Sequence, residues 1–244
     1  IQQRPAPAGG SIFSRDKFRT FTIEKLAGED GEIIDEVFCL FGDDGERRRF
    51  KASECYWFQT CDTAQKTGTE NDYTAVGTFA ITPDADLLVV EVLHVKIEVP
   101  KQYAFLVDQR DRWPKVRFQA VEDRSSGTGL IQKAKQDGNP FKILNPDSDK
   151  VSRCTQVSIM YENGKVYHRA NASWLEDFES ELVTFPVGAH DDQVDVLAYA
   201  GILAFKRNFS GQLKGYSFER KPEKELTDQE KEDAHKLSRL YGYR

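Results

Sequence analysis

One uninterrupted stretch constrains the fold of this 244-residue chain more than any other feature. Residues 55–62 read Cys-Tyr-Trp-Phe-Gln-Thr-Cys-Asp and lack the strict alternation of apolar and polar residues that marks a strand with one solvent-exposed face. A strand that is buried on both sides is typical of the centre of a sheet that helices cover on both faces. The stretch therefore predicts a central strand, and that strand ends in an acid, Asp62.

The segments that follow predict a mixed α/β fold. Two more strands joined by short turns come directly after the central one, which makes an antiparallel meander. A helix, a fourth strand running into Glu122 and Asp123, a second helix and a short fifth strand come next. The expected ranges of these six elements are 73–81, 87–98, 101–112, 116–121, 127–137 and 141–144.

The remaining elements are read from helical periods and turn signals. Helices are expected over 151–161 and 174–182, with an extended piece at 165–168. Upstream of the central strand, two strand-like segments around Gly42–Gly45 predict a hairpin near residues 36–52, as an extension ahead of the core sheet. A capping box that begins at Thr227 predicts a charged helix to about Leu240.

Three aspartates open the last core helix. Asp191, Asp192 and Asp195 are spaced three and four apart, so they share one helical face. The apolar stripe of this helix consists of Val194, Leu197, Ala198, Ile202 and Phe205. One interpretation is that the aspartates cap the helix and favour its dipole. The other is cation binding, because one aspartate suffices for a cap whereas three crowded carboxylates repel one another.

The acids of three separate elements are expected to meet. If the central strand lies beside the fourth strand, Asp62 comes next to Glu122 or Asp123. A helix that crosses this sheet brings the third set of acids, Asp191, Asp192 and Asp195. Carboxylate oxygens suit Mg²⁺ or Mn²⁺, and two such ions serve phosphodiester hydrolysis.

Charge and cysteine usage narrow the alternatives. The net charge of −6 argues against an ordinary nucleic-acid binder, although a carboxylate site is acidic until metal ions fill it. Local basic segments near residues 47–51, 110–117 and 206–207 are most simply solvated surface. The four cysteines lack C-x-x-C spacing, so we expect buried free thiols rather than a zinc site or disulfides. No apolar run is long enough to cross a membrane, and no signal peptide is visible.

Four stretches, taken together, resemble one family. They are Gln3-Arg4-Pro5 with Gly9, Gly10 and Phe13; Asp62–Gly68 with Asn71–Ala75; Val121–Gly127; and Phe185-Pro186 with His190–Asp195 and Ala198–Ala200. In this order they resemble the C-terminal nuclease domain of tailed-bacteriophage terminase large subunits, which belongs to the ribonuclease H-like superfamily. The resemblance implies a ribonuclease H-like mixed central sheet with antiparallel first strands, then parallel strands, flanked by helices.

The resemblance also implies roles for individual residues. Asp62, Glu122 and Asp192 would be the central catalytic metal ligands, with Asp191 and Asp195 as additional or alternative ones. Alternation beyond Val121 lets only one of Glu122 and Asp123 face the site, and the resemblance points to Glu122. His190 would contact a metal ligand rather than the metal itself, or it would merely be the residue before the helix. The residues implied as contacts to DNA phosphates, or alternatively as solvated surface, are Lys133, Lys135, Lys150 and Arg153.

The expected function follows from the same resemblance. It is a metal-dependent endonuclease domain that cuts concatemeric double-stranded viral DNA with two divalent cations, Mg²⁺ or Mn²⁺. Its partners would be DNA, the portal protein and the small terminase subunit, in the host cytoplasm and without a membrane. Two alternatives stay open: another ribonuclease H-like nuclease of the resolvase or transposase type, or a non-catalytic docking module.

The expected domain organisation has three parts. Residues 1–20, which are rich in Pro and Gly at their start, read as a linker after a missing ATPase domain. Residues 21–210 form the nuclease domain with its hairpin extension, and residues 211–244 form a tail. The chain contains no G-x-x-x-x-G-K-[ST] motif, so we expect no ATP hydrolysis from it.

Overall fold

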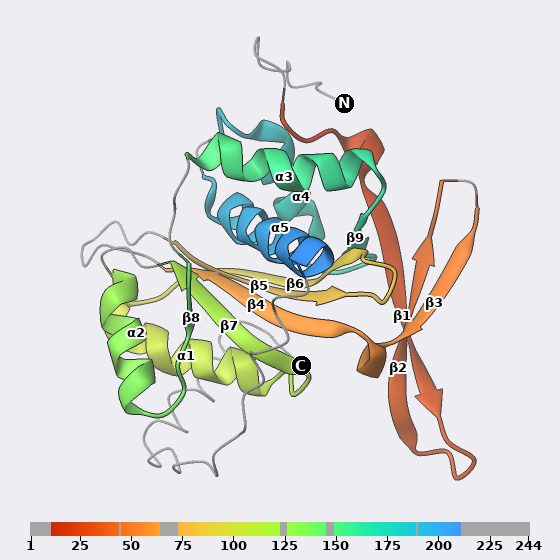
Figure 1. Cartoon of the computed structure of the whole chain (residues 1–244), viewed down its shortest axis with the longest axis horizontal. Coiled ribbons are helices and arrows are strands. Elements are labelled where there is room, and N and C mark those ends of the chain that lie inside the picture. Colours follow the sequence, from red (N-terminus) through yellow and green to blue (C-terminus); the bar gives the residue numbers. More distant parts are fainter. Residues whose placement is uncertain are drawn as a thin grey trace.

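The computed structural model describes residues 11–43, 45–63, 73–122, 126–144, 149–188 and 190–210 (Figure 1). The strands are β1 (Arg19–Ala27), β2 (Ile33–Phe41), β3 (Arg47–Lys51), β4 (Tyr56–Asp62), β5 (Tyr73–Ile81), β6 (Leu87–Lys96), β7 (Val116–Glu122), β8 (Lys142–Leu144) and β9 (Val166–Arg169). The helices are α1 (Val99–Asp111), α2 (Ser126–Gln136), α3 (Lys150–Glu162), α4 (Leu175–Thr184) and α5 (Asp192–Ser210), with short 3₁₀ turns at Arg15–Lys17 and Ala52–Glu54. The predicted C-terminal helix near 227–240 lies outside the described residues.

All nine strands form one mixed sheet in the order β3-β2-β1-β9-β6-β5-β4-β7-β8. The predicted meander is confirmed, since β5 pairs antiparallel with both β4 and β6. The fourth predicted strand, β7, lies parallel to β4 on its other side. The predicted fold class, a mixed central sheet flanked by helices, is therefore confirmed.

The N-terminal extension is larger than the sequence suggested. The predicted hairpin is present as β2 and β3, but sequence patterns missed β1, which pairs with β2 on one side and with β9 on the other. The extension thus belongs to the main sheet. Within the predicted linker, residues 1–10 lie outside the described part, whereas the Phe13 side chain is buried in the core and Arg19 begins β1.

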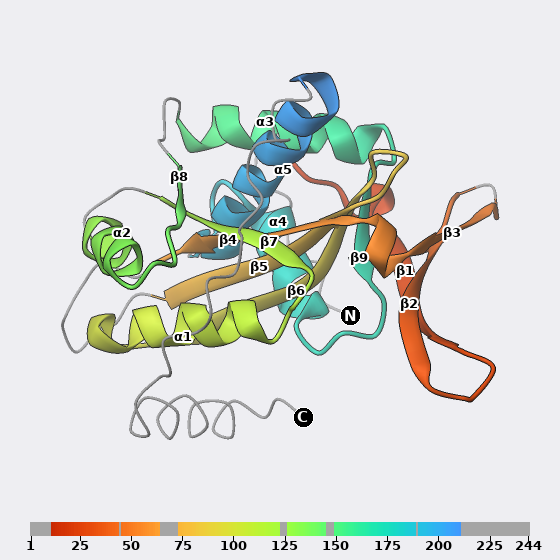
Figure 2. The same cartoon turned by 60° about the horizontal axis from the view of Figure 1, so that its bottom comes forward.

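Helices cover the two faces of the sheet in separate groups. Figure 1 shows α3, α4 and α5 on one side of the sheet and α1 and α2 on the other. In Figure 2, α3 and α5 lie above the sheet and α1 below it, with the β1–β3 extension projecting to one side. Alternate residues of β4 serve the two layers: Phe58 packs in the cluster with α3, α4 and α5, and Cys61 in the cluster with α1 and α2. This two-sided burial explains why the β4 sequence does not alternate.

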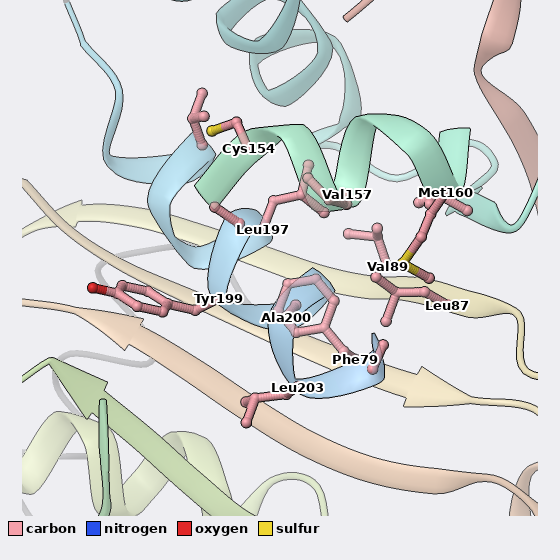
Figure 3. Packing of buried hydrophobic residues seen from close by; sticks show 14 of the residues in the cluster. Phe79, Leu87, Val89, Cys154, Val157, Met160, Leu197, Tyr199, Ala200 and Leu203 are labelled. Atoms are coloured by element: carbon pink, nitrogen blue, oxygen red, sulfur yellow. The ribbon is translucent and has the colours of Figure 1, made fainter. Parts of the chain in front are cut away.

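The α5 helix lies tightly against both the sheet and α3 (Figure 3). Thr60 Oγ1 of β4 donates a 2.6 Å hydrogen bond to the main-chain oxygen of Val196 on α5. On the other side of α5, a Cβ at Gly201 would lie 2.6 Å from Cβ of Val157 on α3, so only glycine permits this approach. The first turn of α5 is therefore held at a fixed place over the sheet.

Two further sequence expectations concern burial and membranes. The four cysteines are buried free thiols, as predicted. Among the described residues, no helix is both long and apolar enough to cross a membrane.

Candidate metal centre

Two carboxylates lie side by side at the ends of neighbouring parallel strands. The register of β4 and β7 pairs Thr60 with Ala120 and Cys61 with Val121, which brings Asp62 level with Glu122. Thr60 contacts α5, and Asp62 follows it by two residues, so both side chains leave β4 on the α5 face. Ala120 packs in the core cluster on the same face, and the same alternation puts Glu122 beneath α5.

The first turn of α5 adds more carboxylates to this pair. Burial raises the pKa of Asp62 well above its usual range, and the negative charges of Asp195, Asp192 and Glu122 raise it further. Since the effect of one charge on another falls off with distance, these acids lie in the same part of the α5 face. The structure thus brings together acids from β4, β7 and α5, the three elements that the sequence singled out.

Cations from α3 face the same locus. Lys150 Nζ lies 2.7 Å from Asp191 Oδ2 and 2.5 Å from Asp195 Oδ2. Arg153 Nη2 lies 3.0 Å from Asp195 Oδ1, and the Arg153 side chain is only 3% exposed. The sequence implied DNA phosphate contacts for both cations, whereas the structure places Arg153 inside the protein and Lys150 between two aspartates.

A histidine that the sequence analysis did not consider contacts the centre. His94 Nε2 of β6 lies 3.1 Å from Asp192 Oδ2, and the His94 ring packs on Tyr73 with centroids 4.1 Å apart. His190 packs against Tyr73 with ring centroids 5.4 Å apart, and its ring lies 6.3 Å from that of His94. A lone histidine in a strand gives no sequence signal that separates a core residue from a ligand's partner.

A glutamate from another helix caps α5. Glu181 of α4 accepts hydrogen bonds from the backbone N–H groups of Gln193 at 2.7 Å and Val194 at 3.2 Å. These are the first-turn donors that a helix leaves unsatisfied. Because Glu181 performs the capping, the cluster of aspartates is not needed for it, which favours the cation-binding interpretation of Asp191, Asp192 and Asp195.

The other predicted residues lie away from the acids or outside the description. Lys133 and Lys135 are exposed on α2, and Lys133 forms an ion pair with Asp137 at 3.1 Å. Asp123 lies outside the described residues, so the choice between Glu122 and Asp123 stays a prediction, with Glu122 on the α5 face.

The chemistry of these side chains suits a hard divalent cation, because they offer carboxylate oxygens as ligands and one imidazole that hydrogen-bonds to a carboxylate. In the part of the chain that the structure describes, however, no three His, Cys, Asp or Glu side chains have the geometry to hold a metal ion already. The physical reason is visible in the contacts: Lys150 and Arg153 draw Asp195 towards α3, and unneutralised carboxylates repel one another.

Comparison with known proteins decides the family. The model of the terminase RNase H-like domain matches residues 59–203, more than half of the chain. This range includes Asp62, Glu122, Asp191, Asp192 and Asp195. The chain belongs to the terminase RNase H-like domain family. The resemblance that the sequence motifs carried is thereby confirmed. No curated protein sequence matches the chain.

Solved structures of terminase nuclease domains are among those similar to this terminase domain. The large terminase nuclease from thermophilic phage G20c with bound magnesium has a TM-score of 0.51 at 16% identity, over 80% of this chain and 98% of that one. The P22 large terminase nuclease domain has a TM-score of 0.47 at 15% identity, over 62% of this chain and 82% of that one. The manganese-soaked human cytomegalovirus terminase nuclease domain has a TM-score of 0.44 at 12% identity, over 61% of this chain and 82% of that one.

Proposed function

We propose that this terminase domain is a metal-dependent DNA endonuclease that cuts concatemeric double-stranded viral DNA during genome packaging. The observation that carries the proposal is the position of Asp62 and Glu122 at the ends of neighbouring strands on the α5 face, beneath the helix whose first turn carries Asp192 and Asp195. Family membership supports a nuclease, and the magnesium-bound and manganese-soaked relatives support a divalent cation. Two ions, Mg²⁺ or Mn²⁺, are proposed.

The residues of this chain would divide the work. Asp62, Glu122 and Asp192 would hold the metal, with Asp191 and Asp195 as additional ligands. Divalent cations in such a site supply Lewis-acid stabilisation of the attacking and leaving oxygens of a phosphodiester. His94 would orient Asp192 through its hydrogen bond, because a ligand fixed by a neighbour loses less entropy on binding metal.

Contacts to the DNA backbone are proposed for the exposed lysines Lys133 and Lys135 of α2, with Lys150 at the centre itself. Such contacts fix the duplex without reading its sequence, so cleavage would be largely independent of sequence. In the assembled motor, the portal protein and the small terminase subunit would present the DNA, in the host cytoplasm. The tether to the motor would raise the local DNA concentration.

The test is cleavage of supercoiled plasmid in Mn²⁺, Mg²⁺ or EDTA. The parent chain is compared with Asp62→Asn and with Asp177→Asn, which changes an exposed acid on α4. We expect metal-dependent nicking and linearisation by the parent and by the Asp177 variant, and none by the Asp62 variant. Equal cleavage by all three would reveal a contaminant or a wrong acid assignment.

Substrate choice separates the rival functions. Preference for branched DNA or for specific ends over plain duplex would favour a resolvase or transposase type. No cleavage in any metal at low salt and high protein concentration, with the fold intact, would favour a non-catalytic docking module.

A further inference from the structure

The Lys150 ammonium group bridges two carboxylates that the proposed function counts among the metal ligands. It lies 2.7 Å from Asp191 Oδ2 and 2.5 Å from Asp195 Oδ2. An ordinary surface ion pair joins one acid to one base in solvent. Here a single ammonium group contacts two acids that lie four residues apart at the start of α5. A divalent cation that bridges the two acids would occupy the same position.

Asp195 has neither oxygen free of a cation. Oδ1 accepts from Arg153 at 3.0 Å while Oδ2 faces Lys150. To bind a metal ion, this carboxylate must give up at least one of the two partners. The question is therefore which cation leaves.

Burial distinguishes the two cations. Arg153 is 3% exposed, and its guanidinium stacks over the Tyr199 ring at 5.0 Å, so moving it would leave a buried charge without its partner. The Lys150 side chain is 27% exposed and has a flexible four-carbon stem that reaches water without backbone movement. Lys150 is thus the cation that is displaced at lower cost.

The acids that Lys150 contacts directly are Asp191 and Asp195. A divalent ion arriving at these two acids meets a resident ammonium group that lies 2.7 Å and 2.5 Å from their oxygens. The positive charge of Lys150 also acts on Asp62, but more weakly than burial and the neighbouring carboxylates do.

We propose that Lys150 is a resident cation that competes with the second divalent ion for Asp191 and Asp195, whereas it competes less directly with the first ion at Asp62, Glu122 and Asp192. This inference rests on the proposed function. Occupancy of the second position then requires a higher concentration of divalent cation than the first. Lys150 thereby sets the concentration of divalent cation that the site needs to bind its second ion.

Titration calorimetry with Mn²⁺ alone, without DNA, tests this. In the parent we expect one tighter and one weaker binding event. Lys150→Met, which keeps the stem without the charge, should tighten the weaker event by about tenfold or more and the tighter one by much less, since a cation in direct contact with Asp191 and Asp195 is removed. Lys150→Arg, which keeps the charge, and Lys25→Met, at an exposed position of β1, should both bind like the parent.

Unchanged or weaker second binding in Lys150→Met, with circular dichroism like the parent, would overturn the inference. If the Met variant does not fold, Lys150→Gln provides the same comparison with an uncharged polar group. Absence of any Mn²⁺ binding by the parent at millimolar concentration would instead count against the proposed metal-dependent function. The two failures are therefore distinguishable.

Discussion

Both carboxylate oxygens of Glu181 hold Gln193: one accepts from its backbone N–H and the other from its side-chain amide, each at 2.7 Å. Glu181 lies on α4, and Gln193 lies between the two aspartates Asp192 and Asp195. The orientation of the acidic turn of α5 is therefore set by a different helix. This frees the aspartate side chains for other contacts.

Removing that cap should loosen the acidic turn. Glu181→Ala is expected to lower the free energy of unfolding in urea by roughly 1–2 kcal/mol, the usual cost of losing an N-terminal cap. The same variant should bind Mn²⁺ more weakly, because Asp192 and Asp195 lose their fixed starting position. Glu176→Ala, an exposed position on the same helix, is the matched control. Parent-like Mn²⁺ affinity in Glu181→Ala would refute the positioning role.

The histidine behind Asp192 offers a second test. His94→Ala should weaken Mn²⁺ binding or cleavage by roughly 10- to 100-fold, as expected for a group that orients a metal ligand. His94→Gln retains a hydrogen-bond donor and should lose less. Identical loss in both variants would point to the packing of His94 on Tyr73 as the cause.

Crowding of carboxylates should cost stability when no divalent ion is present. Since the folded-state pKa of Asp62 lies above its unfolded value, the penalty is absent below the unfolded pKa and grows as pH rises towards the folded one. In EDTA at pH 7.5, Asp62→Asn should therefore have a higher Tm than the parent, and the difference should shrink near pH 4.5. Added Mn²⁺ should raise the Tm of the parent more than that of the variant. A lower Tm for Asp62→Asn in EDTA would contradict this account.

A buried histidine of β9, next to the C-terminal end of α3, should give the opposite pH dependence. His168 contacts Tyr161 Oη at 2.7 Å and Glu179 Oε1 at 2.8 Å, and burial lowers its pKa despite the Glu179 carboxylate. The contribution of His168 to the free energy of unfolding is then fully present above its unfolded pKa of about 6.5. It falls as pH drops from there towards the folded pKa, by at most about 1.4 kcal/mol per pH unit. Urea unfolding at pH 7.5, 6.5 and 5.5 measures the slope, which should flatten in His168→Gln.

The contact between α3 and α5 should tolerate no extra atom. Gly201→Ala places a methyl group 2.6 Å from Val157 Cβ, so we expect a loss of about 1–3 kcal/mol from overpacking. Gly129→Ala on α2 meets nothing within 4 Å and should be neutral or stabilising by up to about 1 kcal/mol. Equal stabilities of the two variants in urea would show that the helices separate freely.

The sequence predicted the centre of the fold better than its edge. The residues of β4 are apolar on both sides because helices cover both faces, and this burial leaves a direct trace in the sequence. The strand β1 leaves a weaker trace, because its partner β9 lies about 150 residues further along the chain and pairing of that kind is a tertiary event. Sequence reasoning therefore treated part of β1 as linker.

The acids of the candidate centre could be nominated from strand ends and helix spacing, but their neighbours could not. Charged residues are usually solvated, so sequence reasoning predicts Arg153 at the surface, although its side chain is buried beside Asp195. His94 and Asp192 are 98 residues apart in sequence, and nothing local in either strand or helix announces their contact. Such pairings depend on how the layers stack.

The parallel pairing of β1 with β9 has a mechanical consequence. β1 lies between β2 and β9 rather than at a free edge, and its residues Arg19–Phe21 bond to a strand that also pairs with β6. Tension applied along β1 from residue 11 would load these hydrogen bonds together in shear, instead of breaking them one after another. The N-terminal side of the domain is thus built to transmit pulling force into the sheet that carries Asp62.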